Sequence, residues 1–161
     1  MSQNYNQDMP FMYSKNDIKD GFWRMNVSKN DAWNFCYVLP HLNKQQSLDD
    51  VEIVVPHALQ MGWCESLPYF STASETARDI IQFYVNHTPI IPPHPLEKFL
   101  HNNKTKYTLE GTTTGTTKQI EVYIDDFIAM TNNLHKHNIQ HMSRAILHGI
   151  HSIFPPPNIT G

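Results

Sequence analysis

Residues 119–131 read QIEVYIDDFIAMT and form the centre of the expected sheet. Strand-forming residues fill 119–124 and 127–131, so we expect two β-strands joined at Asp125-Asp126. Two adjacent acids in a tight turn between apolar strands are costly, because their like charges repel unless a cation neutralises them. A function for this acidic pair is therefore a better explanation than chance.

Asp17 is also expected at a strand end, because the strand-forming run 11–18 contains it. Hard divalent cations need several oxygen ligands, and carboxylates from two strands that meet at one sheet edge supply them. Two such ions roughly 4 Å apart activate a hydroxyl and stabilise a leaving pyrophosphate. Asp49-Asp50 is a contrasting pair, because it lies in a polar loop and is expected to be a solvated turn elsewhere.

The first half of the chain predicts a hairpin followed by a helix. Residues 33–39 and 51–55 are rich in strand formers and are separated by a polar loop. Ser66 is a suitable helix cap, and the helix is expected to continue to about Val85. Its buried stripe is expected to contain Phe70, Ala73, Ala77, Ile80 and Tyr84.

The second half predicts a loop and a last helix. The stretch at about 86–118 is rich in proline and threonine, so we expect a mobile loop that buries little. The helix begins near Asn133 and ends before Pro155. Its apolar face is expected to contain Ile139, Met142, Ile146, Ile150 and Ile153. Its opposite stripe contains His141, Arg144, His148 and His151.

That stripe has two interpretations. His148 and His151 could share a cation at i, i+3 spacing. A solvated, mildly basic helix face explains it better, because no cysteine or acid accompanies them.

The order of strand, hairpin, helix, hairpin and helix predicts an α+β sheet with helices packed on one face. A length of 161 residues with 40% hydrophobic content suits one domain or a piece of one. A net charge of −3 provides no global basic field for nucleic acid. Cys36 and Cys64 form no CxxC motif, and the polar start has no signal-peptide core. We therefore expect an intracellular protein without a targeting segment, in a compartment that the sequence leaves open.

Three segments occur in a recognisable order. Residues 17–22 read DIKDGF, an acid with an aromatic residue five positions on. Residues 55–63 read VPHALQMGW, a loop with a glycine that leads into the first helix through SLPYF at 66–70. Residues 123–126 read YIDD. In this order they resemble the conserved palm motifs of retroelement reverse transcriptases, and the resemblance spans about 11–154. The sequence between these motifs is also similar to polyproteins of LTR-type retrotransposons.

The resemblance implies a reverse-transcriptase-like palm sheet and an RNA-directed DNA polymerase that adds deoxynucleotides to a primer 3′-hydroxyl. Asp17, Asp125 and Asp126 would be the catalytic acids. Together with the backbone carbonyl of Ile18, they would bind Mg²⁺, or Mn²⁺ in its place. The residues implied to bind substrate are Asp20, Gly21, Phe22, Met61, Gly62 and Tyr123.

The family also implies a role for each substrate residue. Asp20 and Gly21 would offer backbone N–H groups to the triphosphate. Phe22 would lie against the sugar and exclude a 2′-hydroxyl. Tyr123 would position the primer end, and Met61-Gly62 would approach the incoming nucleotide. Many family members carry a polar or aromatic residue at the place of Met61, which is a departure from the pattern.

The expected organisation is a flexible lead at 1–10 and a partial reverse transcriptase domain at 11–161. That domain would hold a fingers-like hairpin at about 33–55 and the loop at about 86–118, without thumb or ribonuclease H. Implied partners are a primer–template of RNA or DNA, deoxynucleoside triphosphates and the remaining subdomains of a polyprotein, but no membrane. The isolated chain is expected to be inactive, because nothing in it grips the duplex.

Two other functions stay open. The chain could be a non-catalytic retroelement remnant that keeps the palm fold without activity. An RNA-binding module would need exposed sheet aromatics and a basic face. At the level of single residues, Phe22 and Trp23 could both be core aromatics; the resemblance assigns Phe22 to the site, and Trp23 is expected in the core. Gly62 could serve only the turn before the helix.

Overall fold

The computed structural model describes residues 11–40, 51–98, 105–107, 116–132 and 135–155. The chain divides into two compact units. One, called here the loop unit, is Asp20–Phe70. The other, called the sheet unit, combines Met1–Lys19 with Ser71–Gly161. The predicted lead at 1–10 and the pair Asp49-Asp50 lie outside the described residues.

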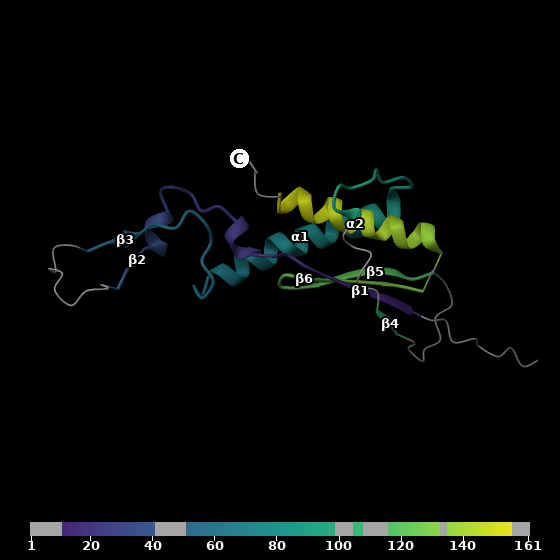
Figure 1. The fold of residues 1–161 in the computed structure, drawn as a ribbon, viewed down its shortest axis with the longest axis horizontal. Helices are drawn as coiled ribbons and strands as arrows, with labels where there is room; N and C mark the ends of the chain where they lie inside the picture. Colours follow the sequence, from purple (N-terminus) through teal and green to yellow (C-terminus); the bar gives the residue numbers. More distant parts are fainter. Residues whose placement is uncertain (1–10, 41–50, 99–104, 108–115, 133–134, 156–161) are drawn as a thin grey trace, which may run out of the picture. The chain divides into compact units, whose positions relative to one another are not determined.

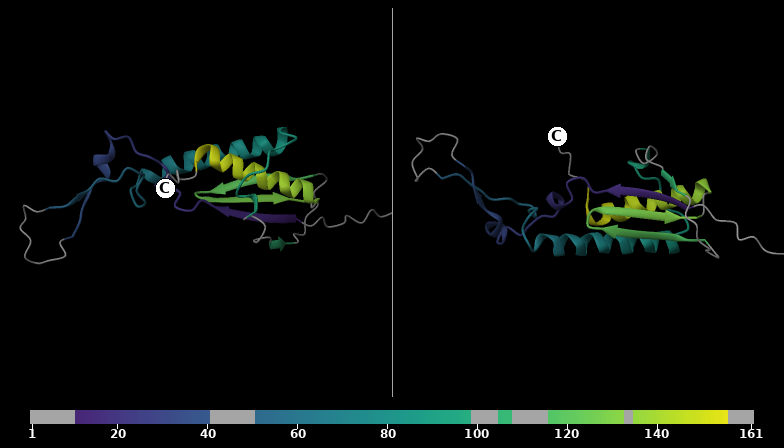
Figure 2. Two further views of the ribbon diagram at one scale, coloured as in Figure 1. Left: turned by 45° about the horizontal axis from the view of Figure 1, so that its top comes forward. Right: turned by 90° about the horizontal axis from the view of Figure 1, so that it is seen from below.

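The sheet unit is built on a four-stranded antiparallel sheet with the order β4-β1-β6-β5. The views from two sides show β1, β6 and β5 running next to one another (Figures 1 and 2). Three strands were expected from their composition, whereas β4 was not. The strands are β1 (Phe11–Asp17), β4 (Thr105–Tyr107), β5 (Lys118–Tyr123) and β6 (Asp126–Thr131).

Both helices, α1 (Ser66–His87) and α2 (Lys136–Ile153), cover one face of this sheet (Figure 1). Alternate residues of β6 are buried, beginning with Phe127 and Ala129, and Ile128 between them is exposed. This period of two is what a half-buried strand requires. The predicted α+β class is therefore correct. Within the described residues, neither helix has the length and apolarity to cross a membrane.

The buried stripe of α1 differs from the predicted one by one position along part of its length. Phe70 and Ala77 are buried as predicted, but the stripe continues through Ser74, Ile81 and Val85. Ala73, Ile80 and Tyr84 are only half-buried. The cause is a close approach of α2, because a Cβ added at its Gly149 would overlap Cγ1 of Ile81.

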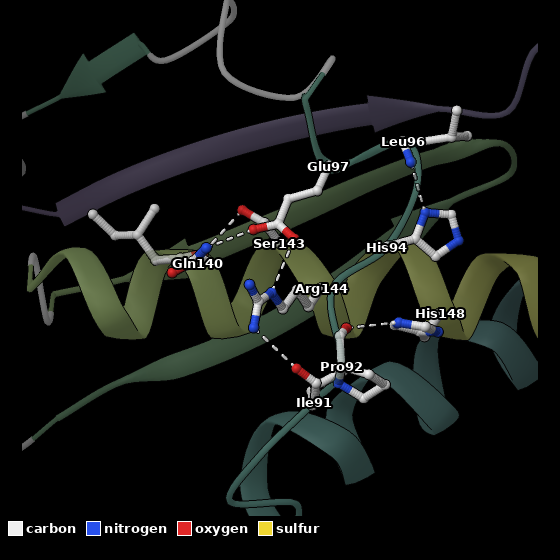
Figure 3. A network of polar contacts seen from close by, with 10 residues as sticks. Ile91, Pro92, His94, Leu96, Glu97, Gln140, Ser143, Arg144 and His148 are labelled. Carbon is white, nitrogen blue, oxygen red and sulfur yellow. Dashed lines mark hydrogen bonds and ion pairs between the residues drawn. The ribbon is translucent and has the colours of Figure 1, made fainter.

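Residues 88–98 follow α1 and are hydrogen-bonded to α2. Most of them are exposed, as predicted for a loop that buries little, but two are buried. Ile91 and Glu97 are 4% and 8% exposed. The Arg144 guanidinium donates from Nη1 to the Ile91 carbonyl at 3.1 Å and from Nε to Glu97 at 3.0 Å (Figure 3). Gln140 donates to the other Glu97 oxygen at 2.7 Å.

The polar stripe of α2 is therefore half-buried rather than fully solvated, contrary to the prediction. His141 Nε2 lies 2.6 Å from the Thr88 carbonyl oxygen, and His148 Nε2 lies 3.0 Å from that of Pro92. The reason is that 88–98 presents backbone carbonyls, which need donors when they are taken from water.

The outer edge of β5 is covered by one side chain. Gln82 of α1 donates to the Lys118 carbonyl at 3.1 Å and accepts the Ile120 N–H at 3.0 Å. Its amide thus occupies the hydrogen-bonding positions that a further strand would use.

The loop unit is mostly irregular. The predicted hairpin exists, but its strands are only β2 (Tyr37–Val38) and β3 (Ile53–Val54). Residues predicted to begin its first strand form a 3₁₀ helix instead, Ala32–Phe35. A second 3₁₀ helix, Phe22–Arg24, follows the end of the sheet unit's first strand in sequence.

Candidate metal centre

The hairpin of β5 and β6 places two acids at its tip. Tyr123 pairs with Asp126, so only Ile124 and Asp125 form the connection. Asp126 is therefore the first residue of β6 rather than a turn residue. Ile124 has a φ of +58°, a left-handed conformation that is a genuine outlier for a β-branched residue. Strain of this kind is concentrated at functional sites.

Strand β1 brings Asp17 to the same tip. Asp17 is the register partner of Asp126, and the next residue, Ile18, donates its backbone N–H to the Asp125 carbonyl oxygen at 3.2 Å. One carboxylate oxygen from each of the three acids lies within 4.8 Å of the others. The structure thus joins two parts of the chain that are 125 − 17 = 108 positions apart.

Lys15 supplies a positive charge to this cluster. Its Nζ lies 2.7 Å from an oxygen of Asp126. The hydrogen bond to Asp126 raises the pKa of Lys15; burial opposes this increase, and the charges of Asp126, Asp17 and Asp125 add to it. Lys15 is two residues before Asp17 on β1, so it projects from the same side of the strand. No sequence motif indicated it, although this spacing could have done so.

The donor set fits a hard divalent cation. It contains carboxylate oxygens alone, and Asp125 and Asp126 are half-buried while Asp17 is exposed. Such oxygen ligands suit Mg²⁺ and Mn²⁺ better than zinc or copper. Three acids and one lysine leave a net charge of −2 at the tip, which a divalent ion would neutralise.

The other residues implied to bind substrate are divided between the units. Tyr123 belongs to the sheet unit and is 73% exposed beside the acids. The others belong to the loop unit. Asp20 has a φ of +56° and is exposed, Gly21 is buried with helical dihedrals, and Met61 is 71% exposed.

Phe22 and Gly62 each have a structural role within the loop unit. The Phe22 ring is 9% exposed and stacks on Phe70, with centroids 4.4 Å apart. Gly62 has a φ of +94° and no heavy atom within 4 Å of an added Cβ, so backbone conformation alone demands glycine there. The turn continues into α1, where the Ser66 hydroxyl donates to the Gln60 carbonyl at 2.6 Å.

Trp23 was predicted in the core, but 53% of it is exposed. Successive side chains of a 3₁₀ helix point about a third of a turn apart. Phe22 takes the inward position, so its neighbour points outward.

Comparison with known proteins finds no matching family model and no matching curated protein.

Proposed function

We propose that Asp17, Asp125 and Asp126 bind divalent metal ions, Mg²⁺ or Mn²⁺, for nucleotidyl transfer in a reverse-transcriptase-like palm. The observation that carries the proposal is the convergence of three carboxylates at a strained hairpin tip. A strained β-branched residue and like charges that Lys15 only partly neutralises both cost stability. A metal-dependent function gives a reason for both.

The bound ions would supply an activated 3′-hydroxyl and charge stabilisation on the leaving pyrophosphate. Asp17 would hold them from the end of β1 and Asp125 from the hairpin connection, and Asp126 would complete the acidic set. Because Lys15 already neutralises part of Asp126, it would have to move away or remain as a fixed charge beside the ions. Deoxynucleoside triphosphates and a primer–template are the substrates that the resemblance implies.

Phe22 would be the sugar gate in this proposal. Its stack on Phe70 would hold the ring in one position, as exclusion of a 2′-hydroxyl by shape requires. The same stack also suits a core aromatic.

A second candidate is a non-catalytic fold that retains the acids. Two observations favour it for this chain: the net charge of −3, and the ion pair that Lys15 makes within the cluster. RNA binding through the loop unit has less support. Trp33 is 66% exposed, but it lies on a 3₁₀ helix rather than on a sheet, and residues 20–70 contain six acids and only three lysines or arginines.

Metal binding is tested by thermal unfolding with increasing Mg²⁺ or Mn²⁺. At ten times the dissociation constant, an ion that binds only the folded chain adds about 1.4 kcal/mol, or about 3–5 °C in Tm for this size. Asp125→Asn keeps the side-chain shape and should abolish the shift. Asp79→Asn is the matched control, because Asp79 is an exposed acid on α1 outside the cluster. Equal shifts in both variants would refute the metal site.

Nucleotidyl transfer is tested by primer extension on an RNA template, using a chain that also carries fingers and thumb subdomains. Extension should disappear in Asp125→Asn and persist in Asp79→Asn. Metal binding without any extension would favour the non-catalytic candidate.

A further inference from the structure

A cluster of three histidines lies in the sheet unit, away in sequence from the acids. His94 belongs to the segment 88–98, and His148 and His151 belong to α2. The His94 ring lies 4.8 Å from that of His148 and 4.6 Å from that of His151, centroid to centroid. Both ring pairs are edge-on, at 84° and 64°. The sequence pattern indicated only the pair His148 and His151 on the helix, and it did not include His94.

These spacings suit imidazoles around one metal ion. Zinc–nitrogen bonds of about 2.0–2.1 Å in a tetrahedral site place ring centroids roughly 5 Å apart. The two observed separations are close to that value. As the rings stand, the three donor nitrogens do not meet within bonding reach of one point, so binding would turn the rings about their Cβ–Cγ bonds.

The surroundings of His148 favour a ligand role. Its Nε2 lies 3.0 Å from the Pro92 carbonyl oxygen, and an N–H donated there leaves the lone pair on Nδ1 (Figure 3). Histidines that bind metals usually donate their other ring N–H to a carbonyl or carboxylate in this way. His94 would give up a contact, because its Nδ1 accepts the Leu96 N–H at 3.1 Å.

We propose that His94, His148 and His151 form a binding site for a divalent transition-metal ion, zinc in the first instance, with the fourth position open to water. Imidazole donors select zinc, copper or nickel over magnesium. The site is therefore chemically distinct from the carboxylate cluster. A bound ion would join the segment 88–98 to α2, in addition to the hydrogen bonds that already hold it.

The test is zinc binding by isothermal titration calorimetry at pH 7.5 in a buffer that does not chelate metals. One ion per chain is expected. His148→Ala and His151→Ala should each weaken binding by at least about tenfold, since even the outer partners of metal ligands are worth 10- to 100-fold. The control is His57→Ala, because His57 is exposed and belongs to the loop unit, and it should bind as wild type does.

His94 needs a variant that keeps the fold. His94→Asn retains an oxygen that can accept the Leu96 N–H, and it should weaken zinc binding as the helix variants do. No zinc binding by wild type, or unchanged affinity in His94→Asn, would overturn the proposal. Loss of zinc binding in Asp125→Asn rather than in the histidine variants would assign the ion to the acids instead.

Discussion

Glu97→Gln should destabilise the sheet unit by about 3 kcal/mol, since removing one partner of a buried ion pair costs about 3–5 kcal/mol. The carboxylate is 8% exposed and accepts from Gln140 at 2.7 Å and Arg144 at 3.0 Å. The substitution preserves shape but leaves the guanidinium without its counter-charge. We expect a loss at the lower end of this range of about 3–5 kcal/mol, because the Arg144 side chain is 22% exposed and still donates a hydrogen bond to the Ile91 carbonyl.

The stability that Glu97 contributes should depend on pH through its pKa. The hydrogen bond from Gln140, followed by that from Arg144, lowers the pKa of Glu97 below its ordinary value of 4.5. A carboxyl whose pKa is lower in the folded state contributes stability that is complete above 4.5 and is lost as the pH falls through the folded value. The difference between wild type and Glu97→Gln should therefore be constant near neutral pH and shrink below pH 4.5.

The assay is urea unfolding from pH 7 down to pH 3, followed by circular dichroism. Glu75→Gln, an exposed acid on α1, is the control and should change stability by less than about 0.5 kcal/mol. Adding Arg144→Met to Glu97→Gln should recover part of the loss, because no uncompensated charge then remains. A loss below about 1 kcal/mol at pH 7, or one that persists unchanged at pH 3, would contradict the reasoning.

Two further predictions concern the helix contact and the acids. Gly149→Ala should destabilise by about 1–2 kcal/mol, since overpacking against Ile81 outweighs the better helix propensity of alanine. In a double-mutant cycle by urea unfolding, adding Ile81→Ala should remove at least about 1 kcal/mol of the destabilisation that Gly149→Ala causes. If the effects of the two substitutions simply add, the contact is refuted. Lys15→Met should tighten Mg²⁺ binding about two- to fivefold, as expected for loss of one exposed competing charge. The control is Lys136→Met, at the exposed start of α2, which should leave the Mg²⁺ affinity measured by calorimetry unchanged. Weaker Mg²⁺ binding in Lys15→Met would contradict the prediction and show that Lys15 helps to hold the ion.

The acidic hairpin could be predicted because the residues that specify it are contiguous in the sequence. Alternating strand formers on both sides of two acids fix the turn within one residue, and the structure moves Asp126 from turn to strand and Ile124 from strand to turn. The proximity of Asp17 required pairing between β1 and β6, which composition alone does not specify. That expectation came from family resemblance and from the strand end at Asp17.

Other features depended on contacts that the sequence does not encode locally. The phase of the α1 stripe is set by Gly149, which lies 68 positions from Ile81 (149 − 81 = 68). The segment 88–98 has no helical or strand pattern, and it is held by side chains of α2 that reach its carbonyls. Strand β4 has three residues, too few for a periodic signal.

The amide of Gln82 has a consequence for the behaviour of the protein at high concentration. An open strand edge is a template on which a second molecule can add its own strand, and repeated addition gives fibrils. Because Gln82 already bonds to the Lys118 carbonyl and the Ile120 N–H, an incoming chain would first have to displace it. A single glutamine on a neighbouring helix thus hinders the addition of a foreign strand along that stretch of β5.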